Sequence, residues 1–149
     1  EYETSMRELA TQAIADEPEK GWIAASPYID FSVWDNEGLR TIYVLNVDWN
    51  NDRPHNATLL LNGKSFDVTM RPQLINTIRC SANLAVMPEG NTSDVLSIQE
   101  KEDSWIVTCQ TTGNDTIHIY NGVSGIIDIR RLPEAGIHRI KVHEFVSYK

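Results

Sequence analysis

The apolar positions of the first twenty residues recur with a helical period. In the stretch SMRELATQAIADE the apolar residues fall every three or four positions, which places them on one helix face. They are Met6, Leu9, Ala10, Ala13 and Ile14. Ser5 with Glu8 fits a capping box at the start, and Pro18 ends the helical pattern. We therefore predict an N-terminal amphipathic helix and linker over residues 1–20, and one further domain over residues 21–149.

From Ile29 onward the period changes to strict alternation, which is typical of strands with one buried face. The clearest case is ATLLLNGKSFDVTM, where Asn62-Gly63 fits the type I′ turn of a two-residue hairpin. That turn pairs Leu59 with Phe66. It places five apolar residues on one face: Leu59, Leu61, Phe66, Val68 and Met70.

Similar alternation marks further segments along the chain. They are IDFSVW, TIYVLNVDW, INTIRCSANLAV, SDVLSIQE, SWIVTCQ, TIHIY and GIHRIKVHEFV. We interpret INTIRCSANLAV as one strand whose inner face carries Ile78, Cys80, Ala82, Leu84 and Val86. Turn residues separate most of the segments. The pattern predicts a mainly β fold, an antiparallel β-sandwich of about nine or ten strands with one N-terminal amphipathic helix.

One segment, TIYVLNVDW, is apolar on both of its faces. Ile42 and Val44 lie on one face, and Tyr43, Leu45 and Val47 on the other. A strand with one face in water does not show this pattern. We expect either the N-terminal helix or a neighbouring domain to cover the outer face, and we favour the helix.

Composition and charge narrow the classes of function. The 149 residues, 41% hydrophobic and 23% charged, suit one globular domain. The net charge of −8, with no local Lys/Arg cluster, disfavours nucleic acid as a partner. Apolar runs of only a few residues predict no membrane span.

The two cysteines, Cys80 and Cys109, lack metal-ligand spacing. Both fall on the apolar side of a predicted strand, where a thiol is unreactive. A disulfide between them would close a loop of about 30 residues and stabilise the fold by about 3.5 kcal/mol. Separate buried thiols are the favoured interpretation, and the disulfide stays open as the alternative.

The order of elements resembles the all-β domain that follows the catalytic (β/α) barrel in many bacterial glycoside hydrolases. The resemblance rests on the leading helix and then on IDFSVWDNEGLRTIYVLNVDW, ATLLLNGKSFDVTMRPQLINTI and GIHRIKV. It implies a non-catalytic accessory domain that stabilises or orients the catalytic domain of the same polypeptide. It also implies a periplasmic or extracellular location. The catalytic acids of that family lie on the barrel, so none is carried over to this chain.

The stretch LNVDWNNDRPHN is the first candidate for chemistry. Asp48, Asn50 and Asp52 have the D-x-N-x-D spacing that opens a calcium-binding loop. Arg53 then stands where such a loop needs glycine, and Leu59 where it needs a bidentate glutamate. An ordinary polar loop is therefore the favoured interpretation. No cofactor is predicted, and Ca²⁺ is the alternative.

The tryptophans give the second candidate, because sugar-binding domains present flat aromatic rings framed by polar side chains. Trp34 lies on a polar strand face beside a turn, whereas Trp22 and Trp105 are predicted core residues. The candidate ligand-binding residues are Trp49, Asp48, Asn50, Asp52 and Trp34. A carbohydrate-binding module that uses these aromatic residues is therefore the alternative function. Cell-surface adhesion or protein interaction is a third.

Catalytic residues are not predicted anywhere in the chain. Glycoside hydrolysis needs two carboxyl groups held across the scissile bond. The acidic residues here fall in turns and on the predicted helix, where charges are normally solvated. We therefore expect this chain alone not to be an enzyme.

Overall fold

The structure is a computed structural model, and it describes residues 21–24, 27–48, 53–72, 74–81 and 83–145. All twelve elements in this part of the chain are β-strands, and neighbouring strands within each sheet run antiparallel. The predicted mainly antiparallel β fold is confirmed. The predicted number of nine or ten strands is too low, and the strands form three sheets rather than two. The helix predicted over residues 1–20 lies outside the described residues.

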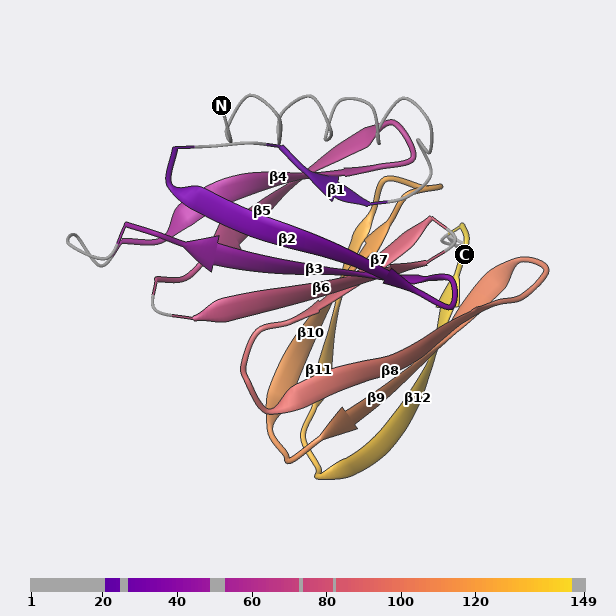
Figure 1. Ribbon diagram of the computed structural model, residues 1–149. Helices are drawn as coiled ribbons and strands as arrows, with labels where there is room; N and C mark the ends of the chain where they lie inside the picture. Colours follow the sequence, from indigo (N-terminus) through magenta and orange to yellow (C-terminus); the bar gives the residue numbers. More distant parts are fainter. Residues whose placement is uncertain (1–20, 25–26, 49–52, 73, 82, 146–149) are drawn as a thin grey trace.

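We name the sheets by their places in Figure 1. The upper sheet has the order β1 (Trp22–Ile23), β4 (His55–Leu61) and β5 (Lys64–Met70). The central sheet has the order β11 (Ile127–Leu132), β10 (Asp115–Asn121), β7 (Leu84–Pro88), β6 (Ile75–Ser81), β3 (Leu39–Asn46) and β2 (Ile29–Asn36). The lower sheet has the order β12 (Gly136–His143), β9 (Ser104–Thr111) and β8 (Ser93–Glu100). Within the described residues, no helix has the length and apolar character needed to cross a membrane.

Two separate hydrophobic cores hold the sheets together. The upper core joins residues of the upper and central sheets, among them Ile42, Leu59 and Ile78. The lower core joins the other face of β7 and β10 to the lower sheet, through residues such as Ile119 and Val107. The central sheet is therefore covered on opposite faces by the two smaller sheets, each over a different part of its width.

The hairpin of β4 and β5 follows the predicted register. Leu59 pairs with Phe66, and the turn residues Asn62 and Gly63 have φ values of 51° and 73°. All five apolar residues predicted for one face of this hairpin are buried. The two predicted core tryptophans are buried as well, Trp22 at 8% and Trp105 at 2% exposure.

The segment INTIRCSANLAV is two strands, so the prediction of one strand is wrong. The chain reverses between β6 and β7, where Asn83 has a φ of 68°. Cys80 lies in the upper core, whereas Leu84 and Val86 lie in the lower core. Ala82, which we predicted on the same face, lies outside the described residues.

The two cysteines are free thiols, so the disulfide alternative does not hold. Cys80 belongs to the upper core and Cys109 to the lower core, so the central sheet separates them. Burial raises the pKa of Cys80 to about 12 and that of Cys109 to about 11. Both thiols are therefore protonated and unreactive near neutral pH.

Candidate functional site

The outer face of strands β2, β3 and β6 carries exposed aromatic side chains. Along β3, Ile42 and Val44 point into the upper core, and the alternating residue Tyr43 points outward with 40% exposure. Trp34 on β2 is 63% exposed. The cover that we expected from the N-terminal helix lies outside the described residues. We call the outer surface around Trp34 and Tyr43 the aromatic face.

The strand register makes Trp34 and Tyr43 diagonal neighbours. Trp34 lies opposite Thr41, and Tyr43 lies opposite Ser32. Such diagonal positions on adjacent antiparallel strands are about 7–8 Å apart, within reach of large side chains. The Nε1–H of Trp34 donates to the Oγ of Ser32 at 3.3 Å, so the indole leans along β2 toward the row that holds Tyr43.

A guanidinium group closes one side of the aromatic face. Arg79 on β6 lies opposite Thr41, and it donates to the Thr41 Oγ1 at 3.1 Å and to the Asp94 Oδ1 at 2.9 Å. The Arg79 side chain is 22% exposed and that of Asp94 is 57% exposed. The buried Nε–H of Arg79 has no hydrogen-bond partner among the described residues. The ion pair joins the central sheet to β8 of the lower sheet and places charge beside the rings.

The aromatic face is hollowed by about 500 Å³. Six residues line the hollow: Trp34, Asn36, Leu39, Thr41, Tyr43 and Arg79. Two rings, an amide and a guanidinium group converge on it. Aromatic faces pack against the C–H groups of a sugar, and amide and guanidinium groups donate to its hydroxyls. The hollow therefore has the side chains that a carbohydrate site requires.

Four of the five predicted ligand-binding residues come from the loop after β3. Trp49, Asn50 and Asp52 lie outside the described residues. Asp48 is 8% exposed, and its Oδ2 lies 2.6 Å from Nε2 of His55, whose ring stacks on Tyr28 with centroids 4.2 Å apart. The Asp48 carboxylate is thus paired with a histidine of the same chain. Because Trp49, Asn50 and Asp52 are not described, the site around Trp49 stays a prediction, whereas Trp34 belongs to the aromatic face.

Metal-binding geometry is absent from the described residues. Among them, no three His, Cys, Asp or Glu side chains come close enough to hold a metal ion. Asp48 is the only described member of the D-x-N-x-D stretch. The calcium alternative therefore stays a prediction.

A second hollow of about 570 Å³ lies between the free edge of β5 and strands β10 and β11. Ile127 and Ile129 form an apolar wall, and His118 contributes a polar group. Its carboxylates come from Asp67 and Glu89. The Glu89 oxygens lie 3.4 Å from Nε2 of His118 and 3.8 Å from the Arg71 guanidinium group. The Glu89 carboxylate is thus close to both basic side chains of this hollow.

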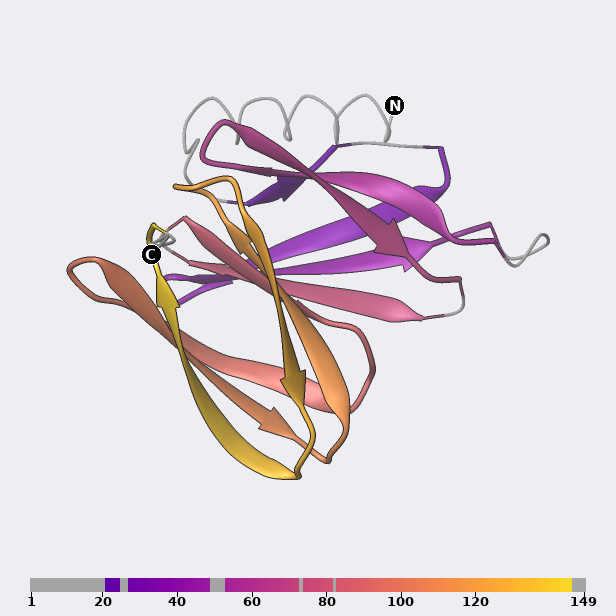
Figure 2. The ribbon, with the colours of Figure 1, turned by 180° about the vertical axis from the view of Figure 1, so that it is seen from behind.

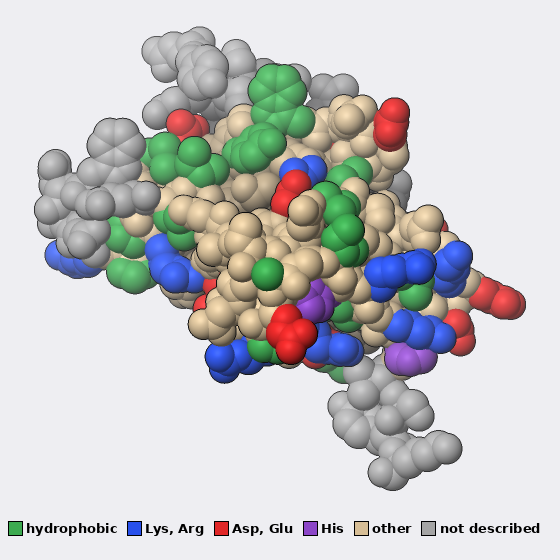
Figure 3. All heavy atoms as spheres, turned by 90° about the horizontal axis from the view of Figure 1, so that it is seen from below, with side chains coloured by type: hydrophobic (Ala, Val, Ile, Leu, Met, Phe, Trp, Pro, Cys, Tyr) green, Lys and Arg blue, Asp and Glu red, His purple; other side chains and the backbone are tan. Residues whose placement is uncertain are grey.

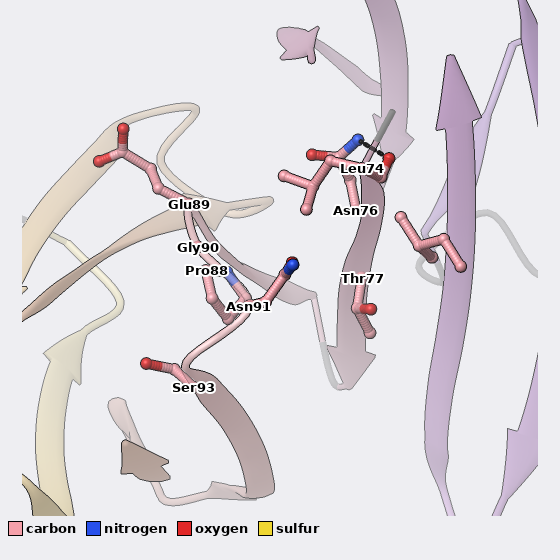
Figure 4. A pocket seen from close by; sticks show the side chains of 9 residues that line it. Leu74, Asn76, Thr77, Pro88, Glu89, Gly90, Asn91 and Ser93 are labelled. Carbon is pink, nitrogen blue, oxygen red and sulfur yellow. Dashed lines mark hydrogen bonds between the residues drawn. The ribbon is translucent and has the colours of Figure 1, made fainter. Parts of the chain in front are cut away.

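A third, smaller notch of about 160 Å³ opens where β6 and β7 diverge. In Figure 4 the side chain of Asn91 points toward β6, and that of Glu89 points away. The Asn76 amide donates to the Leu74 carbonyl at 3.3 Å and is itself buried. The notch is smaller than the roughly 300–1,000 Å³ of most ligand pockets.

The aromatic face could be predicted only in parts. The alternation placed Trp34 on a polar face and Tyr43 on the outer face of its strand, but it did not show that the two lie together beside Arg79. That grouping depends on the pairing of β3 with β6, which the β4–β5 hairpin separates in the sequence. Seen from below in Figure 3, hydrophobic side chains lie in patches among charged ones.

The fold and the site together define the class: an all-β domain with an aromatic, partly charged hollow on one sheet face. Comparison with known proteins adds no relative, since no protein-family model, curated protein or solved structure matches the chain. The resemblance to accessory domains of glycoside hydrolases therefore stays a prediction.

Proposed function

We propose that this domain is a non-catalytic carbohydrate-binding module of a larger carbohydrate-active protein, a β-sandwich in architecture, which holds glycan on its aromatic face. The observation that carries the proposal is the pair of exposed rings, Trp34 and Tyr43, on adjacent strands beside Arg79. Exposure of the large apolar indole ring to water is unfavourable, and a bound ligand would cover the ring. Its position beside polar groups therefore favours a binding role.

The open position of the hollow on a sheet surface bears on the kind of glycan. The rings stand on a sheet surface rather than inside a closed pocket, so a chain of sugars can cross them from either side. The polar partners lie at one margin, where Arg79 and the half-exposed Asp94 are ion-paired. We therefore propose an internal stretch of a polysaccharide as the ligand. A short sugar bound by its end is a poorer fit.

A second candidate function rests on the other end of the same sheet face. Leu45 pairs with Ile75 in register, and Ile75 and Val47 are 60% and 38% exposed. This end is apolar and offers little hydrogen bonding to sugars. It is suited to contact with the catalytic domain of the same polypeptide, which is the stabilising role that the resemblance implies. Such a domain works outside the cytoplasm, in the periplasm or the extracellular space.

Retention on insoluble polysaccharides tests the carbohydrate proposal. The wild-type chain, Trp34→Ala and Tyr43→Ala are incubated with cellulose, insoluble xylan, chitin, granular starch and insoluble mannan, and the unbound fraction is measured. Loss of one stacking ring is expected to weaken binding by about 1.5 kcal/mol, about tenfold. Phe145→Ala is the matched control, because Phe145 is 66% exposed and does not line this hollow. Far-UV circular dichroism verifies that the variants fold.

The outcomes separate the two candidates. Retention of the wild type that Trp34→Ala abolishes and Phe145→Ala preserves supports the glycan site. No retention on any of the five polymers, or retention indifferent to Trp34, overturns it. The docking role is tested with Ile75→Asp in the full-length protein, where a lower melting temperature of the catalytic domain is expected.

A further inference from the structure

Strand β11 is an edge of the central sheet that exposes isoleucine side chains. It pairs with β10 on one side, and no strand pairs with its other side in the described part of the chain. Ile127 and Ile129 are 43% and 59% exposed, and the preceding Ile126 is 37% exposed. Figure 2 shows β11 on the side of the molecule turned toward the viewer. An exposed apolar edge is a template for pairing with another strand.

The hydrogen-bond pattern identifies which residues of β11 have free backbone groups. The Asn121 N–H donates to the Ile126 carbonyl, and the Glu89 N–H donates to the Thr116 carbonyl on the other side of β10. Along two antiparallel strands, opposite residues alternate between pairs that hydrogen-bond to each other through their backbone groups and pairs that do not. In the observed register, residues 128, 130 and 132 therefore bond to β10. The N–H and C=O groups of Ile127, Ile129 and Arg131 point to the free edge.

Three of the five other sheet edges carry features that discourage pairing. Strand β1 has only two residues, and β8 has a bulge between Val95 and Ser97. Strand β12 presents exposed Arg139 and Lys141. Short length, bulges and charged side chains are known protections of edges. On β11, Arg130 Nε lies 2.9 Å from the Asp128 carboxylate, and Arg131 donates to the Asn114 Oδ1 at 3.0 Å, so the charges of Asp128 and Arg130 are paired within the strand.

The sequence of β11 is complementary to itself. In an antiparallel pair of two copies centred on Ile129, that residue lies opposite its own copy. Asp128 then lies opposite Arg130, and Ile127 opposite Arg131, each pair occurring twice. The bonded positions of this arrangement are 127, 129 and 131, the same residues whose backbone groups point outward. Backbone hydrogen bonding also permits pairs centred on residue 128 or 130, but these place Asp128 or Arg130 opposite its own copy, so charge selects the register centred on Ile129.

We propose that two copies of this chain associate through β11, in an antiparallel pair centred on Ile129 that joins the two central sheets. The closed two-fold symmetry prevents further growth at this edge. A single strand pair buries a small area, so the dimer is weak and depends on concentration. The proposal is independent of glycan binding, because β11 and the aromatic face lie at opposite ends of the central sheet.

Cysteine cross-linking tests the register. The Cα atoms of a bonded antiparallel pair are about 5.5 Å apart, within the range of a disulfide. Ile129→Cys should therefore form a disulfide-linked dimer under mild oxidation. Ile127→Cys is the matched variant: its copy would lie four residues away, about 13 Å, and should not cross-link. Ile137→Cys, at a 65% exposed isoleucine of β12, measures random collision. The native thiols are buried and do not interfere.

Charge exchange gives a second readout that needs no cysteine. Asp128→Arg or Arg130→Asp places like charges across the interface and should abolish concentration-dependent dimerisation in analytical ultracentrifugation. The double exchange restores both cross-strand pairs and should restore the dimer. Dimer formation in wild type and double variant but in neither single variant supports the proposal. A wild type that stays monomeric, with Ile129→Cys no faster to cross-link than Ile137→Cys, overturns it. Equal cross-linking of Ile127→Cys and Ile129→Cys overturns the register.

Discussion

The buried thiol of Cys80 makes the stability of this domain sensitive to alkaline pH. Burial raises the pKa of this thiol from 9.0 to about 12, and nearby Arg40 opposes the rise without cancelling it. In the unfolded chain the thiol ionises near its ordinary pKa. Between the two values the unfolded state therefore binds fewer protons than the folded state, and stability falls as pH rises.

The size of the fall follows from the two pKa values. Each pH unit between pH 9.0 and about pH 12 removes about 1.4 kcal/mol, so Cys80 alone removes about 2 kcal/mol by about pH 10.5 and about 4 kcal/mol by about pH 12. Cys109, raised to about 11, and Tyr120, raised from 10.0 to about 12, act in the same direction. Domains of this kind are stable by about 5–15 kcal/mol. We therefore expect alkaline unfolding to begin between about pH 10 and pH 12.

Urea unfolding of wild type and Cys80→Ala tests this reasoning. Tryptophan fluorescence gives the free energy of unfolding at about pH 8, 9.5 and 10.5. Cys80→Ala should be less stable by about 1 kcal/mol at the lowest pH, because a buried group is lost. This difference in stability should vanish or reverse at the highest pH, because the variant lacks the Cys80 thiol whose ionisation in the unfolded state destabilises the wild type. Added salt controls for repulsion within the acidic chain. Free energies that fall in parallel for the two proteins would refute the reasoning.

Two further substitutions test how the sheets are joined. A Cβ at Gly122 would lie 2.7 Å from the Asn83 carbonyl oxygen and 2.9 Å from Cγ of Leu61, so Gly122→Ala should lower the unfolding free energy by about 1–3 kcal/mol in thermal denaturation. Adding Leu61→Ala to the Gly122→Ala variant removes only the clash with the Leu61 side chain. The loss of stability caused by the clash with the Asn83 carbonyl oxygen should remain. Asn46 is fully buried and its side chain makes three hydrogen bonds to the backbone, so Asn46→Ala should lower the free energy of unfolding in urea by about 2–4 kcal/mol. The side chain of Asn76 makes one such bond, so Asn76→Ala should lower it by about 1 kcal/mol. Equal losses for the two asparagines would contradict this account.

The local features of the fold were predictable because they depend on neighbouring residues. The hairpin at Asn62-Gly63 follows from turn chemistry, and its register from the two-residue loop. The alternating pattern predicted which residues of most strands face the core, including Trp105 on β9. These features need no knowledge of which strands meet in space.

The layering of the sheets could not be predicted in the same way. Strand β7 is buried on both faces, with Ala85 and Met87 in the upper core and Leu84 and Val86 in the lower core. Alternation carries no information about a strand that is covered on both sides, and LAVM merges with the strand before it. The available signal was Asn83, a residue that adopts positive φ more readily than most, at the end of a long alternating run.

The aromatic face is created by register more than by composition. Trp34, Thr41 and Arg79 form one row across β2, β3 and β6 because two successive pairings place them there. A shift of either pairing by one residue would turn one member to the opposite face of the sheet. If β11 also joins two copies, each dimer carries two such rows at the far ends of one extended sheet. A polysaccharide long enough to reach both rows would bind the dimer more tightly than a short oligosaccharide, whereas the Asp128→Arg monomer would bind both with similar affinity.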